Sequence, residues 1–215
     1  MTAPFIYRTE NPKLFAACAR FISTEETRYY LKGVKVEPQA AGGVKLIATD
    51  GHRMCVAFDE TGYANREAII TPPKIKMPPA WFSAKGALFR DGLAYMFKFL
   101  ALDEPAAARP TAEIAALAAD TAVAVEIDGQ FPQWSIIAKW YDGQEAATDL
   151  TVNFAYMSDV RDVKKLLTGD KNPVVPLRIP PGGEPASSRL TDDVAVWIMP
   201  MRIQDADAFK RPNWL

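Results

Sequence analysis

The sequence is poor in the residues on which most catalytic and metal sites depend. Among its 215 residues it has one histidine, His52, and two cysteines, Cys18 and Cys55, which form no CxxC pair. Zinc sites need clustered cysteine and histidine ligands. A Ser-His-Asp or Cys-His arrangement would have to use His52, which lies in a predicted turn. Phosphate-binding motifs of the GxxxxGK[ST] or GxGxxG kind are also missing. These absences argue against an enzyme, a metal site and a bound cofactor.

The sequence also has little excess charge and no long apolar run. Its formal net charge is −1 and its pI is about 5.9. A protein that binds nucleic acid through many phosphates usually has a basic excess, so any DNA contact would need a basic stripe on one face. No apolar run approaches the ~20 residues of a membrane helix, and no leader-like segment stands at the N-terminus. Two unpaired thiols fit a reducing compartment. We expect a soluble, cytoplasmic protein with no membrane partner.

What the sequence does have is enough apolar content, 49%, for one large domain or two small ones. Asn11 and Pro12 suit the start of a helix, which the apolar spacing extends over 12–22. Strand formers predict strands over 28–36, 44–49 and 53–58, with a hairpin turn at Asp50-Gly51. This end of the chain therefore predicts a β-α-β-β-β order.

The same order is predicted near the other end. We expect a strand over 150–155, a helix over 159–168 capped by Ser158, and strands over 174–179 and 194–199. Between the two ends we expect a hairpin over 87–100, a short helix over 111–119 and a strand over 123–127. Residues 204–215 are expected to extend across the surface. The pattern predicts an α+β fold with sheets on one side and helices on the other.

Three passages, read together, resemble one protein family. They are residues 27–34 (TRYYLKGV) with 48–54 (ATDGHRM), residues 128–134 (DGQFPQW), and residues 197–203 (WIMPMRI). The bacterial DNA polymerase III β subunit, the DNA sliding clamp, has RYYLNG, ATDGHRL, DGxFPxY and a terminal MPMRL in this order. Lys32, Met54 and Trp197 depart from the family pattern, and a bulky Trp197 could reshape a pocket beside it.

The resemblance covers only part of the family's length. Residues 10–70 resemble the first half of its second domain, 121–138 the closing strand of that domain, and 150–203 the second half of its third domain. Residues 72–120 match poorly. The resemblance implies a DNA-clamp fold with a first domain over 1–140 and a partial second domain over 141–215.

Clamps of this family encircle duplex DNA and tether polymerases without covalent chemistry, and helices line the hole with basic side chains. The resemblance therefore implies a processivity factor with duplex DNA and DNA polymerase as partners, and it makes a clamp loader a further candidate. Its predicted helices carry the candidates for DNA contact: Lys13, Arg20, Arg28, Arg161, Lys164 and Lys165. Basic residues opposite an apolar stripe are also typical of an ordinary solvated helix face.

The family also has a pocket that takes a short apolar peptide from polymerases and repair factors. Matching its motifs onto this chain gives the expected lining: Leu31, Thr49, Gly51, His52, Arg53, Met54, Met199, Pro200, Met201 and Arg202. Methionine adapts to varied apolar side chains, and arginine or histidine can hold peptide carbonyls at a rim. Met199 and Met201 could equally be plain strand residues, one of which faces the core.

Two functions remain open on the sequence alone. The first is a homo-oligomeric ring that tethers a polymerase on DNA; with two domains per chain, a six-domain ring would be a trimer. The second is a non-encircling adaptor or competitor that binds clamp-interaction peptides without a ring. The sequence gives no indication of the natural peptides, of a loader, or of a cellular or phage origin.

Overall fold

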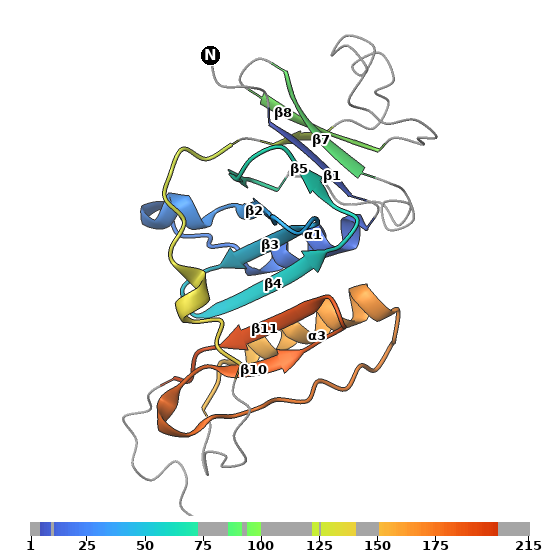
Figure 1. Ribbon diagram of the computed structural model, residues 1–215. Helices are drawn as coiled ribbons and strands as arrows, with labels where there is room; N and C mark the ends of the chain where they lie inside the picture. Colours follow the sequence, from blue (N-terminus) through green and yellow to red (C-terminus); the bar gives the residue numbers. More distant parts are fainter. Residues whose placement is uncertain are drawn as a thin grey trace, which may run out of the picture.

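The computed structural model describes residues 5–9, 11–72, 86–91, 94–99, 122–124, 126–140 and 151–201. These residues form two antiparallel sheets and a layer of helices (Figure 1). The larger sheet has the strand order β10-β11-β4-β3-β2-β6. Its strands are β10 (Ala186–Arg189), β11 (Val194–Ile198), β4 (Arg53–Asp59), β3 (Val44–Thr49), β2 (Val34–Pro38) and β6 (Ala68–Ile70). The α+β class that the sequence predicts is confirmed.

The larger sheet joins the two ends of the chain. β3 and β4 form the predicted hairpin, with Thr49 opposite Met54 around the turn. β11 pairs with the other edge of β4, with Ile198 opposite Arg53 and Val194 opposite Ala57. One continuous sheet therefore crosses from residues below 72 to residues above 186. The domain boundary at 140/141 stays a prediction, and this sheet spans it.

Strand alternation gives the larger sheet two apolar faces. Along β3, Leu46 and Ala48 belong to a large core cluster, whereas Ile47, between them, belongs to a second cluster. Along β11 the same alternation puts Val196 in the first cluster and Trp197 in the second. Because successive strand side chains point to opposite faces, the two clusters lie on opposite sides of the sheet. Both faces are covered by other parts of the chain.

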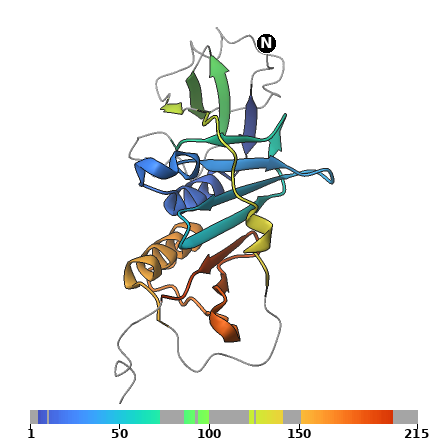
Figure 2. The ribbon, with the colours of Figure 1, turned by 90° about the vertical axis from the view of Figure 1, so that its left-hand side faces the viewer.

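Helices cover the first of these faces. α1 (Pro12–Cys18) continues into a 3-10 turn, η1 (Ala19–Phe21), and contacts α3 (Phe154–Thr168), so that the two helices lie side by side (Figure 2). Proline stands at the first position of α1, where its missing N–H needs no partner. The prediction of a helix over 12–22 is confirmed over most of its length, with a tighter last turn.

The second helix begins earlier than predicted. The Asn153 side chain accepts a hydrogen bond from the Ala155 N–H at 2.9 Å and caps α3 there, whereas Ser158 lies inside the helix. The predicted strand over 150–155 is therefore wrong for residues 151–155: 151–153 form no strand, and α3 begins at Phe154. Gly169 ends the helix at φ 75°, a left-handed conformation that glycine adopts without steric cost. Both asparagine and serine cap helices well, and the sequence pattern favoured the wrong one.

Two further predicted strands differ in the structure. Residues 26–31 form a 3-10 segment, η2 (Glu26–Leu31), so the strand predicted over 28–36 exists only from Val34, as β2. Residues 174–179 form no strand apart from one bridge between Arg178 and Ser187. η6 (Pro181–Gly183) then leads into β10. Of the elements predicted over 150–199, the described residues thus keep only a helix, α3, and a final strand, β11, which pairs with β10.

The smaller sheet has the order β5-β1-β7-β8-β9. Its strands are β5 (Tyr63–Ala64), β1 (Ile6–Thr9), β7 (Gly86–Asp91), β8 (Ala94–Phe99) and β9 (Ala122–Ala124). The hairpin predicted over 87–100 is confirmed as β7 and β8, whereas of the strand predicted over 123–127 only Val123 and Ala124 lie in β9. The helix predicted over 111–119 and the segment 204–215 lie outside the described residues.

Candidate functional site

Residues 126–140, which we call the strap, cross the face of the larger sheet that the helices leave open (Figure 2). The strap begins with a hydrogen bond from the Ile127 N–H to the Ile69 carbonyl at 2.8 Å. An ion pair between Arg66 and Glu126 at 2.5 Å fixes the same end. Phe131 is buried in the second cluster, and η5 (Trp134–Ile136) forms a turn over the sheet. The strap converts an outer sheet face into a second packed layer.

Charged side chains under the strap are paired with one another. The Lys35 ammonium lies 2.9 Å from Glu37 and 3.0 Å from Glu67, and the Trp134 indole N–H donates to Glu37 at 3.2 Å. Burial raises the pKa of Glu37, but hydrogen bonds from Lys35 and Trp134 outweigh burial and leave that pKa below its ordinary value. Burial likewise lowers the pKa of Lys35, and the two carboxylates outweigh it and raise the pKa. Both groups are therefore charged at neutral pH.

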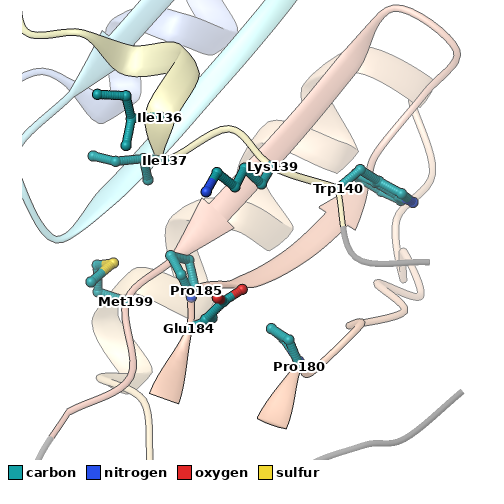
Figure 3. Close-up of a pocket in the computed structure, with 8 residues that line it drawn as sticks. All are labelled: Ile136, Ile137, Lys139, Trp140, Pro180, Glu184, Pro185 and Met199. Carbon is teal, nitrogen blue, oxygen red and sulfur yellow. The ribbon is translucent and has the colours of Figure 1, made fainter. Parts of the chain in front are cut away.

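A groove opens where the end of the strap meets the turn before β10 (Figure 3). Its volume is about 340 Å³, within the range of pockets that bind small ligands and peptide side chains. The lining residues are Ile136, Ile137, Lys139, Trp140, Pro180, Glu184, Pro185 and Met199. Ile136 and Trp140 are 59% and 43% exposed, which leaves large apolar surface open to a partner.

Trp197 shapes one wall of this groove from beneath. Its ring is buried in the second cluster and lies edge-on to Trp140, with ring centroids 6.3 Å apart. Its indole N–H donates to the Lys139 carbonyl at 3.1 Å. A smaller residue at position 197 could not brace both strap residues. Trp197 therefore supports two of the strap residues that line the groove beside Met199.

The predicted pocket residues that the structure describes do not come together in one site. Met199 lines the groove and is 37% exposed, and Pro200 and Met201 follow it at the same end of β11. Leu31 and Met54 are instead buried in the second cluster, with exposures of 4% and 2%. They support the layer beneath the strap and expose almost no surface to solvent. Arg202 lies outside the described residues.

The predicted residues of the β3–β4 turn form a rigid local network. The Thr49 hydroxyl donates to the Arg53 carbonyl at 2.8 Å and accepts from the Gly51 N–H at 3.0 Å. Gly51 has φ 91°, and a Cβ there would lie 2.5 Å from a guanidinium nitrogen of Arg28. The positive φ favours glycine, whereas the Arg28 guanidinium is the end of a flexible side chain and could shift. His52 is exposed, and its carbonyl accepts from the Met199 N–H at 2.8 Å, which joins the turn to the groove wall.

Arg53 points away from the groove, toward the helices. It pairs with Asp50 at 2.9 Å and with Asp159 of α3, and its guanidinium lies 5.2 Å from the Phe21 ring and 4.9 Å from the Tyr156 ring. Burial lowers its pKa, but the two carboxylates outweigh burial and raise it. The contacts make Arg53 a link between the turn and α3, on the opposite face of the sheet from the strap.

The basic residues predicted for DNA contact lie on or beside the helix layer, and they differ in their exposure and in whether they are paired. Arg161 pairs with Asp162 at 2.9 Å, Lys164 donates to the Leu190 carbonyl, and Arg28 pairs with Glu25 at 3.2 Å. Lys13 is half-buried on α1, whereas Arg20 in η1 and Lys165 on α3 are exposed. Among the described residues, no ion pair involves these last three. Half of the predicted set is thus held by neighbouring carboxylates or a carbonyl.

Most of the groove was missed at the sequence level. Residues 136–140 and 180–185 have no strand or helix periodicity, so their position over the sheet could not be inferred. One signal was present: Ile136 and Ile137 lie just after the DGQFPQW passage, separated from it by Ser135, and two adjacent branched apolar residues are unexpected in an exposed turn. The recurrent prolines at 180, 181 and 185 indicate an extended rim.

The described part of the chain offers little basis for other kinds of site. It contains no group of three or more histidine, cysteine or acidic residues placed to hold a metal ion. No helix within it has the length and apolar character to cross a membrane. Cys18 and Cys55 are free thiols, both fully buried, with their sulfurs 3.7 Å apart. Burial raises the pKa of Cys55, so its thiol stays protonated.

Comparison with known proteins gives a match at the level of structure. No family model and no curated protein matches the sequence. The sliding clamp of Pseudomonas aeruginosa is 13% identical with a TM-score of 0.57, covering 93% of this chain and 66% of that one. The Bartonella birtlesii clamp, solved bound to griselimycin, is 15% identical with a TM-score of 0.59 and the same coverage. The β subunit of Borrelia burgdorferi is 12% identical with a TM-score of 0.61, covering 94% and 65%.

This chain thus spans about two thirds of the length of the solved clamps that it matches. The similarity extends over nearly the whole chain, including the helix layer and both sheets. The chain has the fold of the bacterial DNA polymerase III β subunits, the DNA sliding clamps.

Proposed function

We propose that this protein is a clamp-like, non-enzymatic factor that contacts duplex DNA through its helix layer and binds short peptides of DNA polymerase and other replication proteins in the groove. The observation that carries the proposal is the open apolar groove beside Met199 in a chain with the sliding-clamp fold. The groove lies on the strap face of the sheet, opposite the helices, so both contacts could be made at once.

Peptide binding is supported by the chemistry of the groove. Ile136, Trp140 and Met199 provide exposed apolar surface of three shapes, which suits aliphatic and aromatic anchors of a short peptide. Methionine and tryptophan are favourable contact residues because one adapts its shape and the other buries a large area. A clamp-interaction peptide that inserts an apolar side chain here would bury much of this surface.

DNA contact is supported by the charge of the helix layer. Exposed Arg20 and Lys165 are the strongest candidates, because neither is paired with another described residue. Basic side chains on helices contact phosphates without reading bases, so the proposed binding is independent of sequence. With few free cations, the contact would be weak for one molecule and would gain from a closed ring that cannot dissociate sideways.

The preferred assembly is a homo-oligomeric ring, and two domains per chain would make it a trimer. One alternative is favoured by a specific observation: half of the predicted DNA-facing cations are already paired. A non-encircling adaptor, or a competitor for clamp-binding peptides, would need the groove alone. Light scattering on a sizing column separates the two, because the chain is 23.7 kDa and a closed trimer has three times that mass.

Peptide binding is tested by fluorescence anisotropy with a labelled peptide that carries a bacterial clamp-binding motif. We expect saturable binding, and we expect Met199→Ala to weaken it about tenfold, which corresponds to ~1.4 kcal/mol. The matched control is Val174→Ala, which truncates an exposed apolar side chain outside the groove. Equal affinity of Met199→Ala and wild type would remove the groove assignment.

A further inference from the structure

The groove combines an apolar wall with one charge of each sign. Lys139 comes from the strap and Glu184 from the turn before β10, so the two charges stand on different walls (Figure 3). Neither side chain forms an ion pair with another described residue. A ligand that matches this surface has an apolar anchor flanked by acidic groups on one side and basic groups on the other.

The sequence beyond Met201 contains a segment with this chemistry. Residues 204–211 read QDADAFKR, in which Asp205 and Asp207 precede Phe209, and Lys210 and Arg211 follow it. An acidic block, one aromatic anchor and a basic block thus occur in a single run of eight residues. Residues 202–215 lie outside the described residues and continue the chain directly from Met201.

The attachment point makes this segment a local ligand. Met199 is itself part of the groove wall, and Phe209 follows it by ten residues. A chain of ten residues spans up to ~35 Å, so Phe209 can reach any part of a groove that begins at its own tether. A short tether gives an effective concentration on the order of 1 mM, which fills a site even when the intrinsic affinity is modest.

We propose that residues 204–211 bind the groove of the same molecule, with Phe209 among the apolar residues, its acidic side toward Lys139 and its basic side toward Glu184. The segment then competes with partner peptides, so that a partner must displace it. This inference rests on the proposed peptide-binding function of the groove. The groove is then a regulated site, because a partner peptide occupies it only to the extent that it outcompetes the tethered segment.

The test compares three full-length proteins: wild type, Phe209→Ser and Trp214→Ser. The probe is a fluorescein-labelled peptide with the sequence of residues 202–213, and the readout is its anisotropy. We expect Phe209→Ser to bind the probe about tenfold more tightly than wild type, since a ~1 mM effective concentration against a dissociation constant of ~0.1 mM occupies most grooves. Trp214→Ser changes an aromatic residue of the same segment outside the charged run, and we expect it to behave as wild type.

Adding Ile137→Asp to the Phe209→Ser chain should abolish binding of the probe, because it places a charge in the apolar wall. Equal affinities of wild type and Phe209→Ser for the probe would overturn the inference. If the segment acts between molecules, the solution mass of wild type should rise with protein concentration and that of Phe209→Ser should not. This result would overturn the intramolecular assignment.

A parallel titration with the clamp-motif peptide separates this inference from the proposed function. If that peptide binds wild type and Phe209→Ser with equal affinity and the probe binds neither, the tail inference falls and the proposed function stands. If neither peptide binds either protein, the proposed function falls and the inference falls with it. Tighter binding of both peptides to Phe209→Ser supports both.

Discussion

The two faces of the larger sheet differ in how completely they are covered. On the helix side, α1, α3 and the sheet bury a continuous cluster that includes Leu46, Cys55 and Val160, each with no exposed surface. On the strap side, the cluster around Ile47 and Trp197 is smaller, and the strap that closes it ends in exposed Ile136 and Trp140. The same strands supply both faces through their alternation.

The difference shows how one sheet can serve stability on one side and binding on the other. Regular helices satisfy their own backbone hydrogen bonds, so they can close a core fully. The strap, whose one regular element is the short 3-10 turn η5, must be fixed by side chains, here Arg66, Glu37 and Trp197. It covers the sheet only partly, and the apolar surface that remains at its end is the groove.

The largest expected effect comes from the helix-side core. Leu46→Ala should lower the free energy of unfolding by about 2–5 kcal/mol, because it removes a fully buried side chain and leaves a cavity. Urea denaturation measures the loss. Under conditions where the variant is folded, affinity for the clamp-motif peptide should be unchanged. A parallel loss of affinity would show that the two faces are not separable.

A smaller effect is expected at the link between the β3–β4 turn and α3. Arg53→Ala leaves the carboxylates of Asp50 and Asp159 without their shared cation and should cost about 1–3 kcal/mol of stability. Arg189→Ala is the control, because its pair with Asp192 is exposed and should contribute less than ~1 kcal/mol. Since Arg53 faces the helices, peptide affinity should stay unchanged. A strong affinity loss would place its side chain at the peptide site after all.

The strap should be sensitive to acid. The folded-state pKa of Glu37 is lowered, so its contribution to stability is present above the ordinary glutamate pKa of ~4.3 and is lost as pH falls through the lowered value. Glu37→Gln should cost about 1–2 kcal/mol at pH 7, since it removes the charged acceptor of Lys35 and Trp134. Its deficit relative to wild type should shrink in denaturation curves below pH 4. A deficit that does not depend on pH would show that the ion pair between Lys35 and Glu37 does not contribute to stability.

The smallest expected effect concerns DNA. Lys165→Ala should reduce the slope of log affinity against log salt concentration by about 1 if this lysine contacts one phosphate. Lys45→Ala is the matched control, because Lys45 lies on the strap face, 5.4 Å from the Trp134 ring. Filter binding to duplex DNA over a range of salt measures both. Equal slopes for the two variants would show that Lys165 of α3 does not contact DNA.

Local parts of the fold could be predicted because neighbouring residues decide them. Asp50-Gly51 fixed the β3–β4 hairpin, and Pro12 and Gly169 marked helix ends. The start of α3 was wrong because Asn153 and Ser158 are both good caps. The pairing of β11 with β4 could not be inferred from periodicity, since strand neighbours so far apart in the chain leave no local signal.

The site was predictable only where a motif carried it. Met199 was found through the MPMR passage and lines the groove. Leu31 and Met54 came from the same motif matching, and alternation alone could not tell that the strap covers their face of the sheet. The other groove walls, 136–140 and 180–185, are irregular segments whose positions depend on long-range contacts such as the hydrogen bond from Trp197 to Lys139.

The central claim, that the strap face binds peptides while the helix face does not, is tested most directly by NMR. Protein with labelled methionine and isoleucine methyl groups is titrated with the clamp-motif peptide. We predict saturable shifts of Met199, Ile136 and Ile137, and no shift of Met157, which packs against the helix-side core. Shifts confined to Met157, or no shift at any methyl group at saturating peptide, would contradict the claim.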